Sequence, residues 1–116
     1  MKTRLAVSEG PHRGGQGVAT DVARAQQVAD ILKAVAHPLR LRIVAILCVE
    51  EITVNALAAR LGATQAIVSQ QLRILRMHRL VTAVRENGHA SYRLQEPRLR
   101  DLVRCVEGCA RAVGPQ

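Results

Sequence analysis

Cys105 and Cys109 are four residues apart, and Cys48 is the only other cysteine of the chain. In a helix this spacing places both thiols on one face, with Cβ atoms about 5–6 Å apart. Two thiolates so placed can bind a soft metal ion or arsenite, and a third from Cys48 would complete a trigonal sulfur site. A direct disulfide between Cys105 and Cys109 fits less well, since it requires Cβ atoms about 3.5–4.5 Å apart; additional bridging sulfur atoms relax that requirement. The alternative is that all three cysteines pack as small apolar side chains.

A second group of side chains has the chemistry needed to read DNA. Gly62 can end one helix in the left-handed conformation, and Thr64 can cap the next. In that next helix, Ile67 or Val68, Leu72 and Leu75 form a buried stripe. The opposite side, which carries amides and hydroxyls that can pair with base edges in a major groove, consists of Gln65, Ala66, Ser69, Gln70 and Arg73.

The apolar periodicity predicts which elements position these groups. Residues 1–19 contain five of the glycine and proline residues and are predicted to be a flexible tail, and residues 20–113 a single domain. Asn87-Gly88 predicts a hairpin turn, because both residues tolerate positive φ. The predicted order is a helix from 20 or 21 to 35, a helix over 39–49 with Arg40 and Arg42 exposed, a short strand at Ile52, helices over 54–61 and from 65, a hairpin within 80–94, and a helix over 98–113.

Composition narrows the class of function. The formal charge is +8, and only 1% of the residues are aromatic, so the core must be aliphatic. A basic surface attracts polyanions such as double-stranded DNA. No apolar run is long enough to cross a bilayer, and the first residues lack an apolar signal core, so we expect a cytoplasmic protein without a membrane partner. The chain is not expected to be an enzyme, because it has no Cys-x-x-Cys motif, no glycine-rich phosphate loop and no evident acid–base pair.

Three segments together resemble the ArsR/SmtB family of bacterial winged-helix repressors, over about residues 24–112. They are 32–43 (LKAVAHPLRLRI), 61–76 (LGATQAIVSQQLRILR) and 92–94 (YRL). The resemblance implies a mainly α fold with a small β-hairpin wing, in the order α-α-α-α-β-β-α, and a homodimer formed through the first and last helices. It also implies that two reading helices bind successive major grooves of an imperfect palindrome.

The resemblance also assigns roles to individual residues. Gln65, Ala66, Ser69 and Gln70 match base-contacting positions and Arg73 a phosphate-contacting one, whereas Gln71 stands where many members have histidine. The wing candidates are Arg85, His89 and Arg93.

Inducer sites of the family can be compared position by position. A Cys-x-Cys pair is absent, because Thr53 and Asn55 hold those positions. The ligand positions of the usual zinc or nickel site hold Glu96, Arg98, Cys109 and Ala112, which makes that site a poor match. Relatives that sense reactive sulfur species use one cysteine in the second helix and one in the last; Cys48 lies one turn after the usual place, which holds Ala45 here, and Cys109 lies slightly early.

The sequence therefore predicts a DNA-binding repressor that a thiophilic inducer releases from its operator. The inducer, which is arsenite, a soft metal ion or a reactive sulfur species, is expected to act at Cys105 and Cys109, with Cys48 as a third candidate. No permanent cofactor is implied. The alternative is a winged-helix module for binding DNA or protein that has no such inducer and whose cysteines are structural.

Overall fold

The computed structural model describes residues 17–113, which fall into two units divided between Lys33 and Ala34. In the first unit, the one-turn helix α1 (Gly17–Thr20) precedes α2 (Val22–Val35), whose last two residues belong to the second unit. Asp21 caps α2, since its Oδ1 accepts a hydrogen bond from the Arg24 N–H at 3.0 Å. The predicted tail is wrong for residues 17–19, which are helical, and its residues 1–16 lie outside the described residues.

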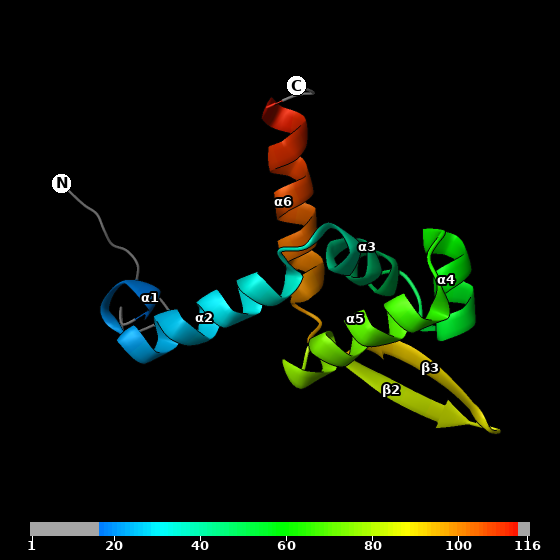
Figure 1. The fold of residues 1–116 in the computed structure, drawn as a ribbon. Helices are drawn as coiled ribbons and strands as arrows, with labels where there is room; N and C mark the ends of the chain where they lie inside the picture. Colours follow the sequence, from blue (N-terminus) through cyan, green and yellow to red (C-terminus); the bar gives the residue numbers. More distant parts are fainter. Residues whose placement is uncertain (1–16, 114–116) are drawn as a thin grey trace. The chain divides into compact units, whose positions relative to one another are not determined.

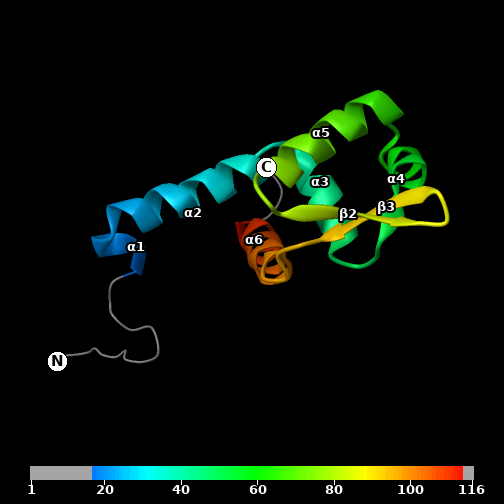
Figure 2. The ribbon, with the colours of Figure 1, turned by 90° about the horizontal axis from the view of Figure 1, so that it is seen from below.

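The second unit combines four helices with a small sheet (Figures 1 and 2). Strands β2 and β3 pair antiparallel from Val81↔Leu94 to Glu86↔His89, and β1 adds to β3 on its other edge, so the order is β1-β3-β2. The predicted winged helix-turn-helix is therefore confirmed. The elements are α3 (Pro38–Leu47), β1 (Ile52–Thr53), α4 (Val54–Leu61), α5 (Gln65–Met77), β2 (Val81–Glu86), β3 (His89–Leu94) and α6 (Leu99–Val113).

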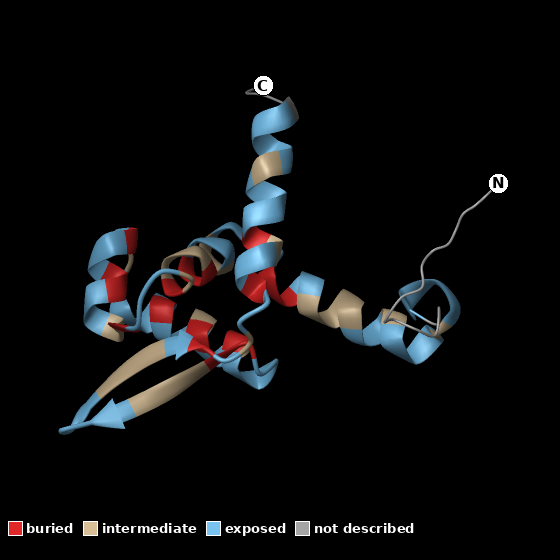
Figure 3. Cartoon of the chain, turned by 180° about the vertical axis from the view of Figure 1, so that it is seen from behind, coloured by how far each residue is buried: buried red, intermediate tan, exposed pale blue. Residues whose placement is uncertain are grey.

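The core of this unit is aliphatic, as the composition requires. The buried stripe of α5 consists of Val68, Leu72 and Leu75, all fully buried. Of the two residues predicted for its first position, Val68 is therefore the buried one, because Ile67 remains 45% exposed. Burial in α6 is confined to its first half, where Leu99 and Val103 pack inward, and the rest of the helix is largely exposed (Figure 3). No helix among residues 17–113 has the length and apolar character needed to span a membrane.

Helix caps fix the turn between α4 and α5. Gly62 adopts the left-handed conformation at φ 67°, and the Ala63 N–H donates to the Ala58 carbonyl at 3.0 Å, which completes a Schellman motif. Thr53 and Thr64 cap α4 and α5 by accepting hydrogen bonds from the backbone N–H groups three residues on, each at 3.2 Å. The predicted ends of both helices are confirmed, and so is the hairpin turn, since Asn87 and Gly88 have φ values of 52° and 80°.

Arg79 ends α5 at a backbone conformation that disfavours it. Its φ is 60°, and the Leu80 N–H donates to the Leu75 carbonyl at 3.0 Å, which again forms a Schellman motif. The left-handed conformation costs a residue with a Cβ about 1–2 kcal/mol, and glycine avoids this cost but loses more chain entropy on folding. We expect Arg79→Gly to raise the free energy of unfolding by about 0.5–1 kcal/mol in urea titrations. Arg76→Gly, within ordinary helix, should lower it by about 1 kcal/mol; a destabilised Arg79→Gly protein would contradict the argument.

Candidate nucleic-acid interface and cysteine sites

Helix α5 presents the predicted reading residues on one exposed face. Val68, Leu72 and Leu75 anchor the helix on the core, so the opposite side is left to solvent. The N-terminal half of this side is free to enter a groove, because the Thr64 cap and the Gly62 turn hold α4 away from it in the helix-turn-helix arrangement. The residues of this face, all of them exposed, are Gln65, Ala66, Ser69, Gln70 and Arg73.

Among the described residues, the cations of α5 and of the wing form no ion pair with an acidic side chain. Within residues 17–113, the arginines in ion pairs are Arg60 with Glu50, Arg98 with Glu96 and Arg104 with Asp101. Arg73 is in none of these pairs, nor is Arg76, which follows on the same exposed side of α5. Their charge is therefore available to phosphate groups. Sequence reasoning did not assign Arg76, although its spacing of three residues from Arg73 was the signal.

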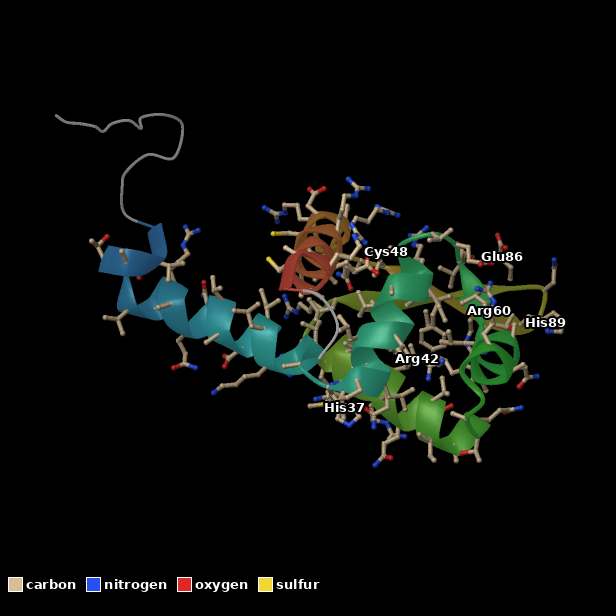
Figure 4. All side chains as sticks on the ribbon, turned by 90° about the horizontal axis from the view of Figure 1, so that it is seen from above. His37, Arg42, Cys48, Arg60, Glu86 and His89 are labelled. Atoms are coloured by element: carbon tan, nitrogen blue, oxygen red, sulfur yellow. The ribbon has the colours of Figure 1, made fainter. Side chains whose placement is uncertain are left out.

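The wing carries its cations on both faces. In β2 and β3 side chains alternate, so the pairs Arg85↔Ala90 and Val81↔Leu94 lie on one face. His89 and Arg93 lie on the opposite face, together with Glu86, which is directly across from His89 at the tip (Figure 4). All three predicted wing residues are exposed, but the structure brings only His89 and Arg93 to a common side.

The three thiols do not converge within one chain. Helix α6 faces α3 through Arg100, Val103, Arg104 and Glu107, which with Cys48 line a cavity of about 250 Å³. At 3.6 residues per turn, Cys105 and Cys109 lie roughly half a turn away from that side of α6, and both are exposed. Among the described residues no three His, Cys, Asp or Glu side chains are grouped to hold a metal ion. The trigonal site expected from Cys48 and the pair is therefore not formed within one chain.

Cys48 occupies a different environment from the pair. It lies half-buried at the end of α3 (Figure 4), and Arg100 Nε donates to its carbonyl oxygen at 2.8 Å. Burial raises the pKa of the Cys48 thiol, and so does Glu107, against the opposing effect of Arg100 and Arg104. The thiol is therefore mostly protonated at neutral pH.

We expect iodoacetamide at neutral pH to alkylate Cys105 and Cys109 before Cys48. The thiolate is the reacting species, and Cys48 combines a raised pKa with partial burial. Peptide mass spectrometry over a time course measures the order, and the unfolded protein in urea provides the control, in which the three rates should become similar. Faster labelling of Cys48 in the folded protein would contradict the assigned environments.

Two of the four positions that hold the family's usual zinc or nickel ligands, Glu96 and Arg98, form an ion pair in this chain. Arg98 donates from Nε and Nη2 to the two carboxylate oxygens of Glu96, at 2.7 and 2.9 Å, and its backbone N–H donates to the same carboxylate at 3.1 Å. These hydrogen bonds lower the pKa of Glu96 to about 2. Both carboxylate oxygens of Glu96 are therefore paired with Arg98.

His37 and Arg40, at the start of α3, have structural roles. His37 caps α3, its Nδ1 accepting a hydrogen bond from the Leu39 N–H at 3.1 Å (Figure 4). Arg42 is exposed as predicted, but the prediction of an exposed Arg40 is wrong: that side chain is half-buried and donates hydrogen bonds to the Ala34 carbonyl and to Gln71. Periodicity missed this because it classes every arginine as a surface residue.

Comparison with known proteins gives a consistent result. Residues 37–83 match the family model described as "Bacterial regulatory protein, arsR family". Over 83 residues the chain is 40% identical to a transcriptional repressor SmtB homolog of Synechocystis sp., covering 72% of this chain and 63% of that protein. It is 37% identical to a biofilm growth-associated repressor of Xylella fastidiosa, covering 72% of this chain and 73% of the relative.

A solved structure shares the architecture. The homodimeric winged helix-turn-helix DNA-binding domain of a Mycobacterium bovis protein superposes with a TM-score of 0.71 at 32% identity. The match covers 78% of this chain and 83% of that domain, and so extends beyond the helix-turn-helix itself.

Proposed function

The chain belongs to the ArsR family of bacterial DNA-binding transcriptional regulators, and from this premise we propose that it represses transcription by binding an imperfect palindrome in double-stranded DNA as a homodimer. The observation that carries the proposal is the exposed face of α5, whose amide, hydroxyl and guanidinium groups form no ion pair with acidic side chains of residues 17–113. Repression would take place in the cytoplasm, where a bacterial operator is found.

The reading face supplies the two kinds of contact that an operator needs. Gln65, Ser69 and Gln70 can donate and accept hydrogen bonds at base edges in the major groove, and Ala66 is small enough to contact a thymine methyl group. Arg73 suits a phosphate, and Arg85, His89 and Arg93 suit the backbone beside the wing. Because the wing has cations on both faces, we assign the closer approach to His89 and Arg93, which share a side.

Exposed apolar surface supports the dimer. Val106 of α6 is 47% exposed, and with Leu41, Ala45 and Ala110 it lines an apolar hollow of about 250 Å³ between α3 and α6. Leu32 of α2 is 46% exposed. Apolar surface of this extent on helix faces is typical of an interface between subunits, and the matched Mycobacterium domain is homodimeric. The first and last long helices are therefore the proposed dimer contacts.

We place the inducer site at the exposed pair Cys105 and Cys109. Two sulfur atoms that bind the same ion lie at most about 4.6 Å apart, which is twice a typical metal–sulfur bond length. The i, i+4 spacing allows the two thiols to come this close, so the pair fits arsenite or a soft metal ion. Cys48 lies on the α3 side of α6, and a sulfur bridge from it to the pair within one chain is therefore disfavoured. A reactive sulfur species would instead have to bridge the pair itself.

Release requires only a modest energetic coupling. An inducer that binds the low-affinity dimer about 100-fold better shifts the DNA equilibrium by about 2.7 kcal/mol. Half-sites one turn apart, about 34–36 Å, tolerate little displacement of the reading helices. A change at α6 that alters the dimer interface would therefore be sufficient.

Fluorescence anisotropy on a palindrome from the protein's own upstream region tests the proposal. The reduced protein should bind this DNA at least about 1000-fold more tightly than a scrambled sequence. Arsenite, a soft metal ion and a persulfide donor are then titrated separately into the complex, and one of them should release it. Equal binding to both DNAs would favour the alternative of a winged-helix module without operator specificity, and tight binding that no inducer disturbs would leave the cysteines structural.

A further inference from the structure

Arg40, in the first turn of α3, joins three helices through one guanidinium group. Its Nε donates to the carbonyl oxygen of Ala34 at 2.5 Å, and its Nη1 donates to Oε1 of Gln71 at 3.0 Å. Both contacts are partly buried. A planar guanidinium holds two such acceptors in fixed directions, which a flexible ammonium does not. The end of α2, the start of α3 and the middle of α5 are thereby tied together.

The contact with Ala34 satisfies a backbone group that α2 leaves unpaired. Ala34 is the penultimate residue of α2, so its carbonyl is one of the last four and has no partner within the helix. Ala34 is only 3% exposed, which limits access of water to that carbonyl. The cationic Arg40 also complements the negative end of the α2 dipole. Both effects stabilise the hydrogen bond between the Arg40 guanidinium and the Ala34 carbonyl.

The contact with Gln71 reaches α5 from the side opposite to the groove-facing residues. Around the helix, Gln71 lies one step of about 100° from Gln70 and nearly half a turn from Arg73. It is half-buried, whereas Gln70 and Arg73 are exposed. Gln71 is therefore placed to receive a hydrogen bond from the protein rather than from a base.

From this geometry we propose that Arg40 is a positioning residue for sequence reading: through Gln71 it fixes the rotation of α5 about its own axis, and through Ala34 it couples that rotation to the end of α2. The inference rests on the proposed DNA-reading function. Gln70 adjoins Gln71, so if loss of the hydrogen bond to Gln71 lets α5 rotate slightly about its axis, the Gln70 amide that faces the bases is displaced. Paired hydrogen bonds to a base edge depend strongly on direction, so selectivity should suffer more than general affinity for DNA.

The test uses two conservative variants and a matched control in the full-length protein. Arg40→Lys keeps the charge but cannot hold both acceptors, and Gln71→Met keeps the side-chain length but removes the acceptor. Arg42→Lys is the control: Arg42 is in the same helix, and its hydrogen bond, at 3.4 Å, goes to the Leu61 carbonyl at the end of α4. Operator and scrambled DNA are titrated by anisotropy at several salt concentrations, and amide exchange is followed in α4 and α5.

Arg40→Lys and Gln71→Met should each reduce the ratio of operator to scrambled affinity by about 10-fold, with an unchanged salt slope. The double variant should be no worse than the more severe single one, because both remove the same contact. Amide exchange should accelerate in α5 for Arg40→Lys, and the control should retain the wild-type ratio.

Several outcomes would overturn the inference. An unchanged affinity ratio, or strictly additive effects of the two variants, would show that the contact does not position α5. An equal loss for both DNAs, with the salt slope reduced by about one, would make Arg40 a phosphate contact instead. If the wild-type protein did not discriminate between the DNAs, the proposed function would fail, but amide exchange in α5 would still decide whether Arg40 anchors the helix.

Discussion

Replacement of Gln70 by alanine is expected to lower the affinity for the operator at least about 10-fold, while binding to scrambled DNA stays within about twofold. A well-placed amide pair with a base discriminates by about 1–3 kcal/mol, and in a dimer both half-sites lose it together. Gln70 is exposed on the groove-facing side of α5, so its truncation should not disturb the helix. Anisotropy titrations with the two DNAs measure the two affinities separately.

Gln95→Ala is the matched control for this experiment, since Gln95 is an exposed glutamine outside the reading helix and the wing strands. It should bind both DNAs as the wild type does. Both variants should unfold within about 0.5 kcal/mol of the wild type, as is usual for exposed positions. If Gln70→Ala weakened binding to the two DNAs equally, Gln70 would contact the backbone; if it kept full selectivity, the assigned role would be wrong.

Much of the fold could be predicted because local signals and the global arrangement agree. Thr53, Gly62 and Thr64 determine the ends of α4 and α5 through hydrogen bonds within a few residues, and Asn87 and Gly88 determine the hairpin in the same way. Such features depend on backbone geometry that the residue type alone favours. The start of α1 was missed because Gly17 is a poor helix former in isolation.

The candidate site was harder to predict from the sequence, because it is formed by contacts between segments that are far apart in the chain. Periodicity placed Gln70 on an exposed face correctly, but it had no means of detecting the contact of Arg40 with Gln71, which are 31 residues apart. It likewise could not show that Cys48 and the pair of α6 lie on different sides of that helix, because the direction in which α6 docks on α3 depends on side-chain packing. Residue spacing predicts which side chains share a face of one helix, whereas the residues that pack against that face depend on the tertiary structure.

The double substitution Cys105→Ser, Cys109→Ser is expected to abolish the response to the inducer while leaving operator binding within about twofold of the wild type. Serine retains the size and polarity of an exposed position but is a poor ligand for soft ions and does not form sulfur bridges. For an inducer that releases the wild type about 100-fold, the lost coupling is about 2.7 kcal/mol. The measurement is anisotropy of the preformed complex during inducer titration.

Cys48→Ser distinguishes a site at the pair from one that uses all three thiols. Cys48 faces the cavity beside Arg100 and Arg104, away from the pair, so this variant should respond to the inducer as the wild type does. If it lost the response as completely as the double variant, the three thiols would have to meet, and within a dimer the third would have to come from the partner subunit. A normal response in the double variant would remove Cys105 and Cys109 from sensing, and their exposure on α6 would then be explained by burial in the dimer interface.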